Sequence, residues 1–198
     1  MLTLNFDPFP IIETPRLILR QPTREDGPEL LEMRSDPQVM QYIPRPMAQS
    51  LEDIYGLLDL FQEMVARNER INWAMEWRET GKVVGMISYV NFKLQHDRAE
   101  VGYSLSRAWH RKGIMMEALC SLLDWGFNTL GLHSAEAIVD AENVASRQLL
   151  EKAGFRKEAL FLEDFFWNDR YRDSVHYGLL RREWEVLKQI STKYATVQ

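Results

Sequence analysis

Cysteine is nearly absent from this sequence, since Cys120 is the only one in 198 residues. One cysteine cannot form an internal disulfide or supply the several thiolates of a zinc or iron–sulfur site. Cys120 lies in a helical pattern of apolar residues, so we expect a small core residue rather than a reactive thiol. The spacing of His96, His133 and His176 does not match that of metal ligands, and we expect no metal.

Long apolar runs and an excess of positive charge are also missing. No run approaches the roughly 20 apolar residues of a membrane-spanning helix. The stretch MLTLNFDPFPIIETPRL lacks the basic and apolar regions of a secretory signal peptide. We therefore expect a cytoplasmic protein with no membrane partner. The formal net charge of −5 at pH 7 does not suit a protein that wraps nucleic acid, but it is compatible with an amine substrate.

The rest of the composition is that of an ordinary globular domain, with 45% hydrophobic and 27% charged residues. The length suits one sizeable domain, so we expect residues 1–198 to form a single unit. Alternating apolar residues predict strands at 16–22, 71–77, 82–92, 98–105, 134–141, 154–167 and 173–180. Helical spacing predicts helices within 22–37, 49–68, 113–131, 143–152 and 181–190. This order of elements predicts an α/β domain with a mixed sheet.

The stretch AWHRKGIMMEAL, residues 108–119, places His110, Arg111 and Lys112 before Gly113 at the start of a predicted helix. Helix N-termini offer unpaired N–H groups and the positive end of the helix dipole, which attract phosphate. A glycine there lets a ligand approach the backbone closely. A P-loop or a dinucleotide fingerprint needs glycines that this stretch lacks. The residues alone predict either a pyrophosphate cradle or an exposed basic helix start.

The same stretch resembles the acyl-CoA loop of the GNAT superfamily of N-acetyltransferases, whose pattern is Gln/Arg-x-x-Gly-x-Gly/Ala. His110 stands in place of Gln or Arg, and Met115 in place of the second small residue. ENVASRQLLEKAGFRKEA, residues 142–159, resembles the second family signature, which is Asn-x-x-Ser, a helix, and Gly-Phe opening a strand. ETPRLILRQPTREDGPEL and NDRYRDSVHYGLL are similar to the RimJ/RimL-type branch, which acetylates the N-termini of ribosomal proteins.

The resemblance implies a fold and an activity. The fold is the α/β (α+β) GNAT fold, a mixed, twisted central sheet of about seven strands flanked by helices and splayed in the middle for acyl-CoA. The activity is transfer of an acetyl group from acetyl-CoA to a primary amine by direct attack in a ternary complex. The acceptor implied is the N-terminal α-amine of a ribosomal or other protein. A small amine, amino acid or antibiotic stays an alternative acceptor.

Three further points stay open. The chain could be a non-catalytic acyl-CoA-binding module on the same fold, or an enzyme that binds another phosphate-containing nucleotide at the Gly113 loop. The resemblance also leaves a homodimer open. The acceptor groove is expected between the helices of residues 25–68 and the strands of residues 155–180.

The resemblance also implies the cofactor-binding residues. Main-chain N–H groups from Arg111 to Met116 would hold the pyrophosphate, and Tyr103 to Leu105 would pair with the pantetheine amides, with an N–H near Leu105 facing the oxyanion. Asn143 would bond the pantetheine arm, and Arg147 would reach the 3′-phosphate or adenine. The full set is Tyr103, Ser104, Leu105, His110, Arg111, Lys112, Gly113, Ile114, Met115, Met116, Asn143 and Arg147. The alternatives are an ordinary strand residue for Leu105, a plain N-cap for Asn143 and a surface arginine for Arg147.

Glu100 is the candidate general base, because its strand resembles the one in which family members carry a catalytic carboxylate. For this role burial should raise its pKa towards neutrality. The alternative is a structural carboxylate that forms a salt bridge with Arg98 or with a neighbouring chain. Glu163 and Asp164 are further candidates, since the branch often has a Glu near them, although an ungapped alignment puts Phe165 at that position.

Ser146 is the candidate acid that protonates the departing thiolate, with a solvent-facing serine as the alternative. Many GNAT enzymes use a tyrosine one helical turn further along, where this chain has Leu150. The remaining conspicuous aromatic residues are expected to fill the core, with an acceptor groove as the alternative. These are Trp73, Trp77, Phe165, Phe166 and Trp167.

Overall fold

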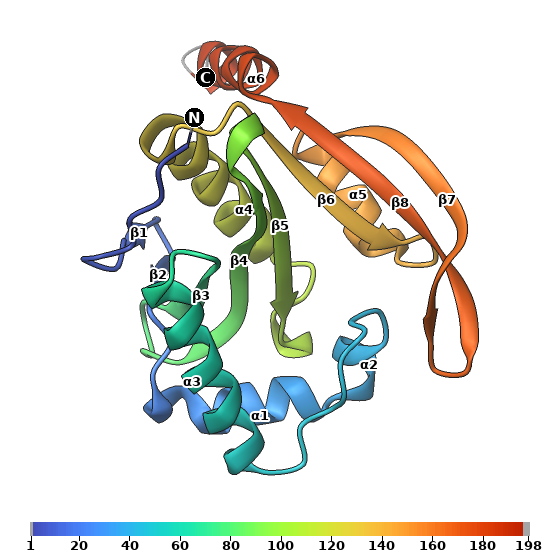
Figure 1. The fold of residues 1–198 in the computed structure, drawn as a ribbon. Coiled ribbons are helices and arrows are strands. Elements are labelled where there is room, and N and C mark those ends of the chain that lie inside the picture. Colours follow the sequence, from blue (N-terminus) through green and yellow to red (C-terminus); the bar gives the residue numbers. More distant parts are fainter. Residues whose placement is uncertain (1, 196–198) are drawn as a thin grey trace.

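One eight-stranded mixed sheet runs through the molecule in the order β1-β2-β3-β4-β5-β6-β8-β7 (Figure 1). The computed structural model describes the backbone of residues 2–195 and the side chains of residues 2–189. The strands are β1 (Ile12–Glu13), β2 (Leu17–Arg20), β3 (Ile71–Trp77), β4 (Val83–Lys93), β5 (Arg98–Leu105), β6 (Ser134–Asp140), β7 (Arg156–Trp167) and β8 (Arg170–Leu180). All seven expected strands are present. The eighth, β1, is two residues long and too short to show alternation.

Six α-helices accompany the sheet in the described part of the chain. They are α1 (Gly27–Ser35), α2 (Pro37–Met40), α3 (Leu51–Ala66), α4 (Ile114–Trp125), α5 (Val144–Lys152) and α6 (Arg181–Ala195). The helix expected within 22–37 is α1, which ends at Ser35. Asp36 is extended, with ψ of 114°. Pro37 is the reason, because the residue before a proline is disfavoured in the helical conformation. No helix among the described residues is both long and apolar enough to cross a membrane.

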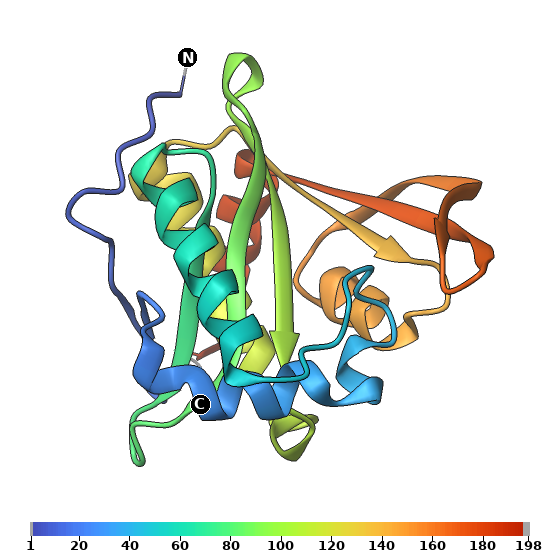
Figure 2. The ribbon, with the colours of Figure 1, turned by 60° about the horizontal axis from the view of Figure 1, so that its bottom comes forward.

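The two faces of the sheet carry different helices. Alternate residues of a strand point to opposite faces, so Trp73 joins the large core that includes α4, while its neighbour Ala74 joins the smaller core under α1 and α3. Figure 2 shows α3 lying over the face opposite α4. Trp73 is fully buried, as expected from the sequence.

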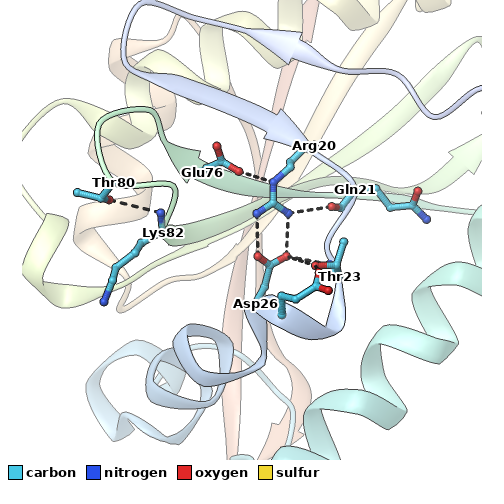
Figure 3. A network of polar contacts seen from close by, with 8 residues as sticks. Arg20, Gln21, Thr23, Asp26, Glu76, Thr80 and Lys82 are labelled. Carbon is cyan, nitrogen blue, oxygen red and sulfur yellow. Dashed lines mark hydrogen bonds and ion pairs between the residues drawn. The ribbon is translucent and has the colours of Figure 1, made fainter.

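An ion-pair network fixes the start of α1 to the sheet (Figure 3). The Arg20 guanidinium donates to both carboxylate oxygens of Asp26, each at 2.8 Å, and also to Glu76 on β3. Asp26 in turn accepts from the main-chain N–H of Thr23 at 2.8 Å, which closes the capping box expected at this point. The network therefore holds α1 over the ends of β2 and β3.

The sheet splays between β5 and β6. β5 pairs with β4 along its whole length, from Arg98 to Leu105. It pairs in parallel with β6 only from Arg98↔Ser134 to Glu100↔Glu136, and beyond that point the two strands diverge (Figure 1). This fork confirms the expected splayed sheet.

The outer part of the β7–β8 hairpin corrects one expectation. Phe166 is 59% exposed rather than part of the core. β7 is the last strand of the sheet, and the far end of the hairpin projects beyond the helices (Figure 2). Strand alternation identified the strand here, but it could not show that this segment extends past the body of the molecule.

Candidate active site

A cleft of about 460 Å³ opens at the fork, and we call it the fork cleft. Residues 101–104 of β5 and 137–140 of β6 form its two sides. Asn143 and Ser146, at the start of α5, lie between them, and Glu100 lines it where the strands part. The fork cleft therefore brings together both candidate catalytic residues.

The edge of β5 that faces the fork cleft carries unpaired backbone groups. The N–H of Ser106 donates to Val84 of β4 at 2.9 Å. Successive N–H groups of a strand point to opposite edges, so those of Tyr103 and Leu105 point away from β4, towards the opening. Because β6 pairs no further than Glu100, these donors form an open sheet edge that fits the amide groups of a pantetheine arm.

The N-terminus of α4 lies at the end of β5, after a short exposed loop. Gly113 is the N-cap, with φ of 74°, and no side chain caps the helix. The first bond of α4 joins the Glu117 N–H to the Gly113 carbonyl at 3.1 Å, so the N–H groups of residues 114–116 belong to the unpaired first turn. The side chains of Ile114 and Met115 are buried in the core. Only the main chain of these two residues is therefore presented to a ligand.

Contacts that the sequence did not reveal brace this loop. Arg16 donates to the Lys112 carbonyl at 3.0 Å and to the Glu117 carboxylate at 2.6 Å. Burial alone would raise the pKa of Glu117, but hydrogen bonds from Thr14 and Arg16 lower it below its ordinary value. The His110 ring, expected at the phosphates, contacts the Leu105 carbonyl at 3.0 Å and so ties the loop to the end of β5.

Glu100 has the environment expected of a general base. Burial raises the pKa of its carboxyl group, and the hydrogen bond from Asn91 Nδ2, at 2.6 Å, only partly opposes this. The structure gives Arg98 a different partner, because its guanidinium bonds Glu136 at 2.7 Å. The expected alternative of an ion pair between Glu100 and Arg98 is therefore wrong, whereas a salt bridge to a neighbouring chain stays an alternative.

Glu136 is the register partner of Glu100 on β6, and its pKa is shifted in the opposite direction. Burial alone would raise the pKa of Glu136, but ion pairs with Lys93 at 2.6 Å and Arg98 at 2.7 Å lower it. The negative charge of Glu136 raises the pKa of Glu100 further. Two neighbouring carboxyl groups thus have pKa values pushed apart by their surroundings, an arrangement typical of acid–base sites.

A second proton-bearing pair spans the fork cleft from β5 to α5. The hydroxyl groups of Tyr103 and Ser146 lie 2.7 Å apart, and Ser146 is only 8% exposed, so it is not a solvent-facing residue. Burial raises the pKa of Tyr103 to about 12, so its phenol is protonated at neutral pH. Asn143 caps α5 by accepting from the Ser146 N–H at 3.1 Å. Leu150 is fully buried, and it leaves the family's tyrosine position apolar.

The other residues singled out in the sequence have different contacts from those expected. Arg147 donates to the Ala141 carbonyl at 3.0 Å and to the Tyr177 hydroxyl at 3.4 Å. Asp164 accepts from Ser174 at 2.6 Å, and neither it nor Glu163 lines the fork cleft. The strands of residues 155–180 do not form the acceptor groove as expected, because β8 lies beyond β6 and β7 is the outer strand. Within the described residues, no three His, Cys, Asp or Glu side chains gather into a metal site.

The fork cleft is also lined by residues from α1 to the start of β3, including three arginines that the sequence analysis did not single out. They are Arg34, Arg45 and Arg70. Their sequence positions gave no signal, because one ends a helix, one lies in a loop and one precedes a strand.

Comparison with known proteins agrees with this geometry. A family model described as an acetyltransferase (GNAT) domain matches residues 16–156, well over half of the chain. The chain is 32% identical over 173 residues to the uncharacterized N-acetyltransferase YoaA of Bacillus subtilis, which covers 87% of this chain and 98% of YoaA. It is 26% identical over 166 residues to the spermidine N(1)-acetyltransferase of Escherichia coli, which covers 84% of this chain and 87% of that protein.

A solved structure gives the same result for the fold. RimL, a ribosomal L7/L12 alpha-N-protein acetyltransferase in complex with coenzyme A, matches with a TM-score of 0.79 at 19% identity, covering 86% of this chain and 98% of that one. The family match and the similarity to YoaA extend over most of the sequence. The chain therefore belongs to the GNAT family of acetyltransferases and is an acyltransferase.

Proposed function

We propose that this protein transfers the acetyl group of acetyl-CoA directly to a primary amine in the fork cleft, with Glu100 as the general base. The observation that carries the proposal is the fork itself, which exposes the edge of β5 immediately after Glu100. The open edge at Tyr103–Leu105 leads to the uncapped N-terminus of α4 at Gly113. These donors suit the pantetheine amides and the pyrophosphate of acetyl-CoA, respectively.

The ammonium group of the acceptor loses two protons in the reaction, and the sulfur of coenzyme A gains one. Acetyl-CoA brings an acetyl group activated as a thioester. Acceptor amines have pKa values of roughly 8 to 10 and are mostly protonated at neutral pH. Glu100, with its raised pKa, takes the proton of the amine, whose nitrogen then bonds the acetyl carbon as the carbon–sulfur bond breaks. The N–H of Leu105 stabilises negative charge on the acetyl oxygen, and the Ser146 hydroxyl gives its proton to the sulfur.

Tyr103 completes this sequence of proton transfers. Its hydroxyl lies 2.7 Å from that of Ser146 and can restore the proton that Ser146 gives up. The bonded nitrogen releases its second proton to solvent, and solvent in turn reprotonates Tyr103. The family's usual tyrosine position holds buried Leu150, so no phenol is available there. A thiol has a pKa of about 8.5, so the thiolate leaves readily and this acid contributes less than the base.

We propose an α-amine as the acceptor, namely the N-terminus of a protein, as in the RimJ/RimL-type branch. The motifs near residues 13–30 and 168–180 support this branch. A free amino acid is the second candidate, and the arginines at one end of the fork cleft favour it over a polyamine.

An acceptor panel tests the proposal. Thiol release from acetyl-CoA would be followed with N-terminal peptides, amino acids, spermidine and an aminoglycoside antibiotic. We expect turnover with α-amine acceptors and little with spermidine. Tight binding of acetyl-CoA without turnover on any acceptor would contradict the proposal and favour a non-catalytic module. Binding of ATP more tightly than coenzyme A would contradict the cofactor assignment.

A further inference from the structure

Three arginines from separate elements converge on one end of the fork cleft. Arg34 lies in the last turn of α1, Arg45 in the segment between α2 and α3, and Arg70 immediately before β3. All three line the same cavity as Glu100. Residues 110–116 do not line it, so the arginines are separate from the expected pyrophosphate site.

Among the described residues, no carboxylate forms a direct ion pair with these arginines, although Glu100 acts on Arg70 from a greater distance. Other arginines of the chain form direct ion pairs, as Figure 3 shows for Arg20 with Asp26 and Glu76. Arg70 donates instead to the Asn72 side-chain oxygen at 3.0 Å and lies over the Phe61 ring, with 5.3 Å from its guanidinium carbon to the ring centroid.

The positive charges in this cluster repel one another. Burial lowers the pKa of both Arg34 and Arg70, and the nearby charge of Arg45 lowers each further, while the Glu100 carboxylate opposes this shift in part at Arg70. Holding like charges together in a partly desolvated place costs free energy, and a bound anion would offset that cost. Buried guanidinium groups with no carboxylate in direct contact, among the described residues, are the feature expected of an anion-binding site.

A neutral donor beside the arginines also lacks a partner. Asn72 is 2% exposed and lines the fork cleft. Its Nδ2 has no hydrogen-bond partner among the described residues, although its Oδ1 accepts from Arg70. Buried polar groups are nearly always bonded, so an unpaired donor at a cavity indicates a missing acceptor.

We propose that Arg34, Arg45 and Arg70 bind a carboxylate of the acceptor, so that the substrate is an amine that also carries a carboxylate group. Guanidinium groups suit this ligand because their planar N–H donors match both carboxylate oxygens. The anion lies at the arginine end of the fork cleft, and the amine faces Glu100. Spermidine, which carries only positive charges, is repelled by the same cluster. This inference rests on the proposed function, because it assigns the acceptor of that site.

Paired acceptors test the inference. One pair is alanine and alaninamide, and the other is two amidated peptides that begin with Glu or with Gln. In each pair the amine is kept and only the carboxylate is removed. We expect kcat/KM to be at least tenfold higher for the acid of one pair, with spermidine poorest. A preference within the first pair identifies an α-carboxylate, and one within the second identifies an acidic side chain.

Two variants connect the preference to the cluster. Arg70→Met should raise KM for the acid at least tenfold with little change in kcat, and should reduce the preference over the neutral partner. Arg67→Met is the matched control, because Arg67 is exposed, pairs with Glu63 and does not line the fork cleft. It should leave both constants unchanged.

The outcomes separate this inference from the proposed function. Turnover with equal kcat/KM for acid and neutral partner, or with spermidine preferred, would overturn the carboxylate site and leave the acetyl transfer standing. If no acceptor is turned over, titration calorimetry of the same acids into the coenzyme A-loaded protein tests whether the anion site exists. Binding that is lost in Arg70→Met would support the anion site, and absence of binding would overturn it.

Discussion

At the scale of single residues, the two carboxyl groups at the fork differ because of their neighbours. Glu100 and Glu136 are partners in the β5–β6 register, and both are partly or fully withdrawn from water. Two cations in direct contact hold Glu136 in its charged form. Glu100 accepts a hydrogen bond from the amide of Asn91, and the more distant charges of Lys93 and His176 offset its burial only in part. A base that must take a proton from an ammonium group near neutral pH needs the second environment.

Glu100→Gln should lower kcat by roughly 10²- to 10⁴-fold, the usual contribution of a general base. In the parent the rate should fall as pH is lowered through the raised pKa of Glu100, because only the carboxylate accepts a proton. The variant should lose this acidic limb in a pH–rate profile. Asn91→Gly removes a contact that lowers the pKa of Glu100, so it should move the limb to higher pH.

Stability measurements control for misfolding of Glu100→Gln. A carboxyl group whose pKa is raised on folding binds more protons in the folded state, so its contribution to stability falls as pH rises. Removing the charge should therefore leave the melting temperature at pH 8 equal or higher. A parent-like pH–rate profile would remove Glu100 from the role of base.

Contacts between residues that lie far apart in the sequence could not be predicted from local patterns. A raised pKa of Glu100 was stated as the condition for its role as base, and the structure shows a shift in that direction. The contact of Tyr103 with Ser146 joins residues 43 positions apart, and no local pattern encodes it. The same holds for Arg34 and Arg70, which meet only because α1 and the start of β3 border one cavity.

At the scale of elements, the N-terminus of α4 has unpaired N–H groups that suit an anion. Gly113 and Gly131 flank the same helical segment, both with positive φ, 74° and 87°. A Cβ added at Gly113 would lie 3.6 Å from Arg16, which is ordinary contact, so the space would tolerate a small side chain. Glycine is favoured at position 113 because of the positive φ and not because space is lacking.

Gly113→Glu should weaken acetyl-CoA binding at least tenfold in titration calorimetry, because it adds bulk and negative charge beside the expected pyrophosphate. Gly131→Ala is the matched control. It has the same left-handed strain, which costs roughly 1 kcal/mol of stability, but lies at the far end of the helical segment. It should bind acetyl-CoA as the parent does, and unchanged affinity in Gly113→Glu would contradict the loop assignment.

Elements with strong local signals were predictable. The capping box of Ser50 and Asp53 begins α3 as expected. The helix within 22–37 was predicted as well, whereas α2 was not, because its four residues are too few to show helical spacing. The exposure of Phe166 depends on where the hairpin projects, which strand alternation does not specify.

At the scale of the whole molecule, the fork divides the sheet into two parts that share a short ladder of three residue pairs. A buried ion pair secures the β6 side of the opening. Arg172 on β8 donates to Asp140 at the end of β6, at 2.7 Å, and both side chains are buried. Asp140 also accepts from the Glu142 N–H at 2.8 Å, which leads the chain into α5.

Arg172→Met should lower the free energy of unfolding by about 3 kcal/mol or more, because it leaves the Asp140 charge buried and unpaired. Adding Asp140→Asn removes that charge and keeps the acceptor for Glu142, so the double variant should recover much of the loss. Urea denaturation measures both. A single variant as stable as the parent would show that the pair does not secure this side of the fork.

A crystal structure with coenzyme A tests the central claim most directly, namely that the open edge of β5 and the start of α4 together seat the cofactor. We predict the diphosphate over the N–H groups of residues 111–116 and the sulfur between β5 and α5, within reach of Ser146. Coenzyme A bound elsewhere, or a fork closed by continued pairing of β6 with β5, would contradict the claim.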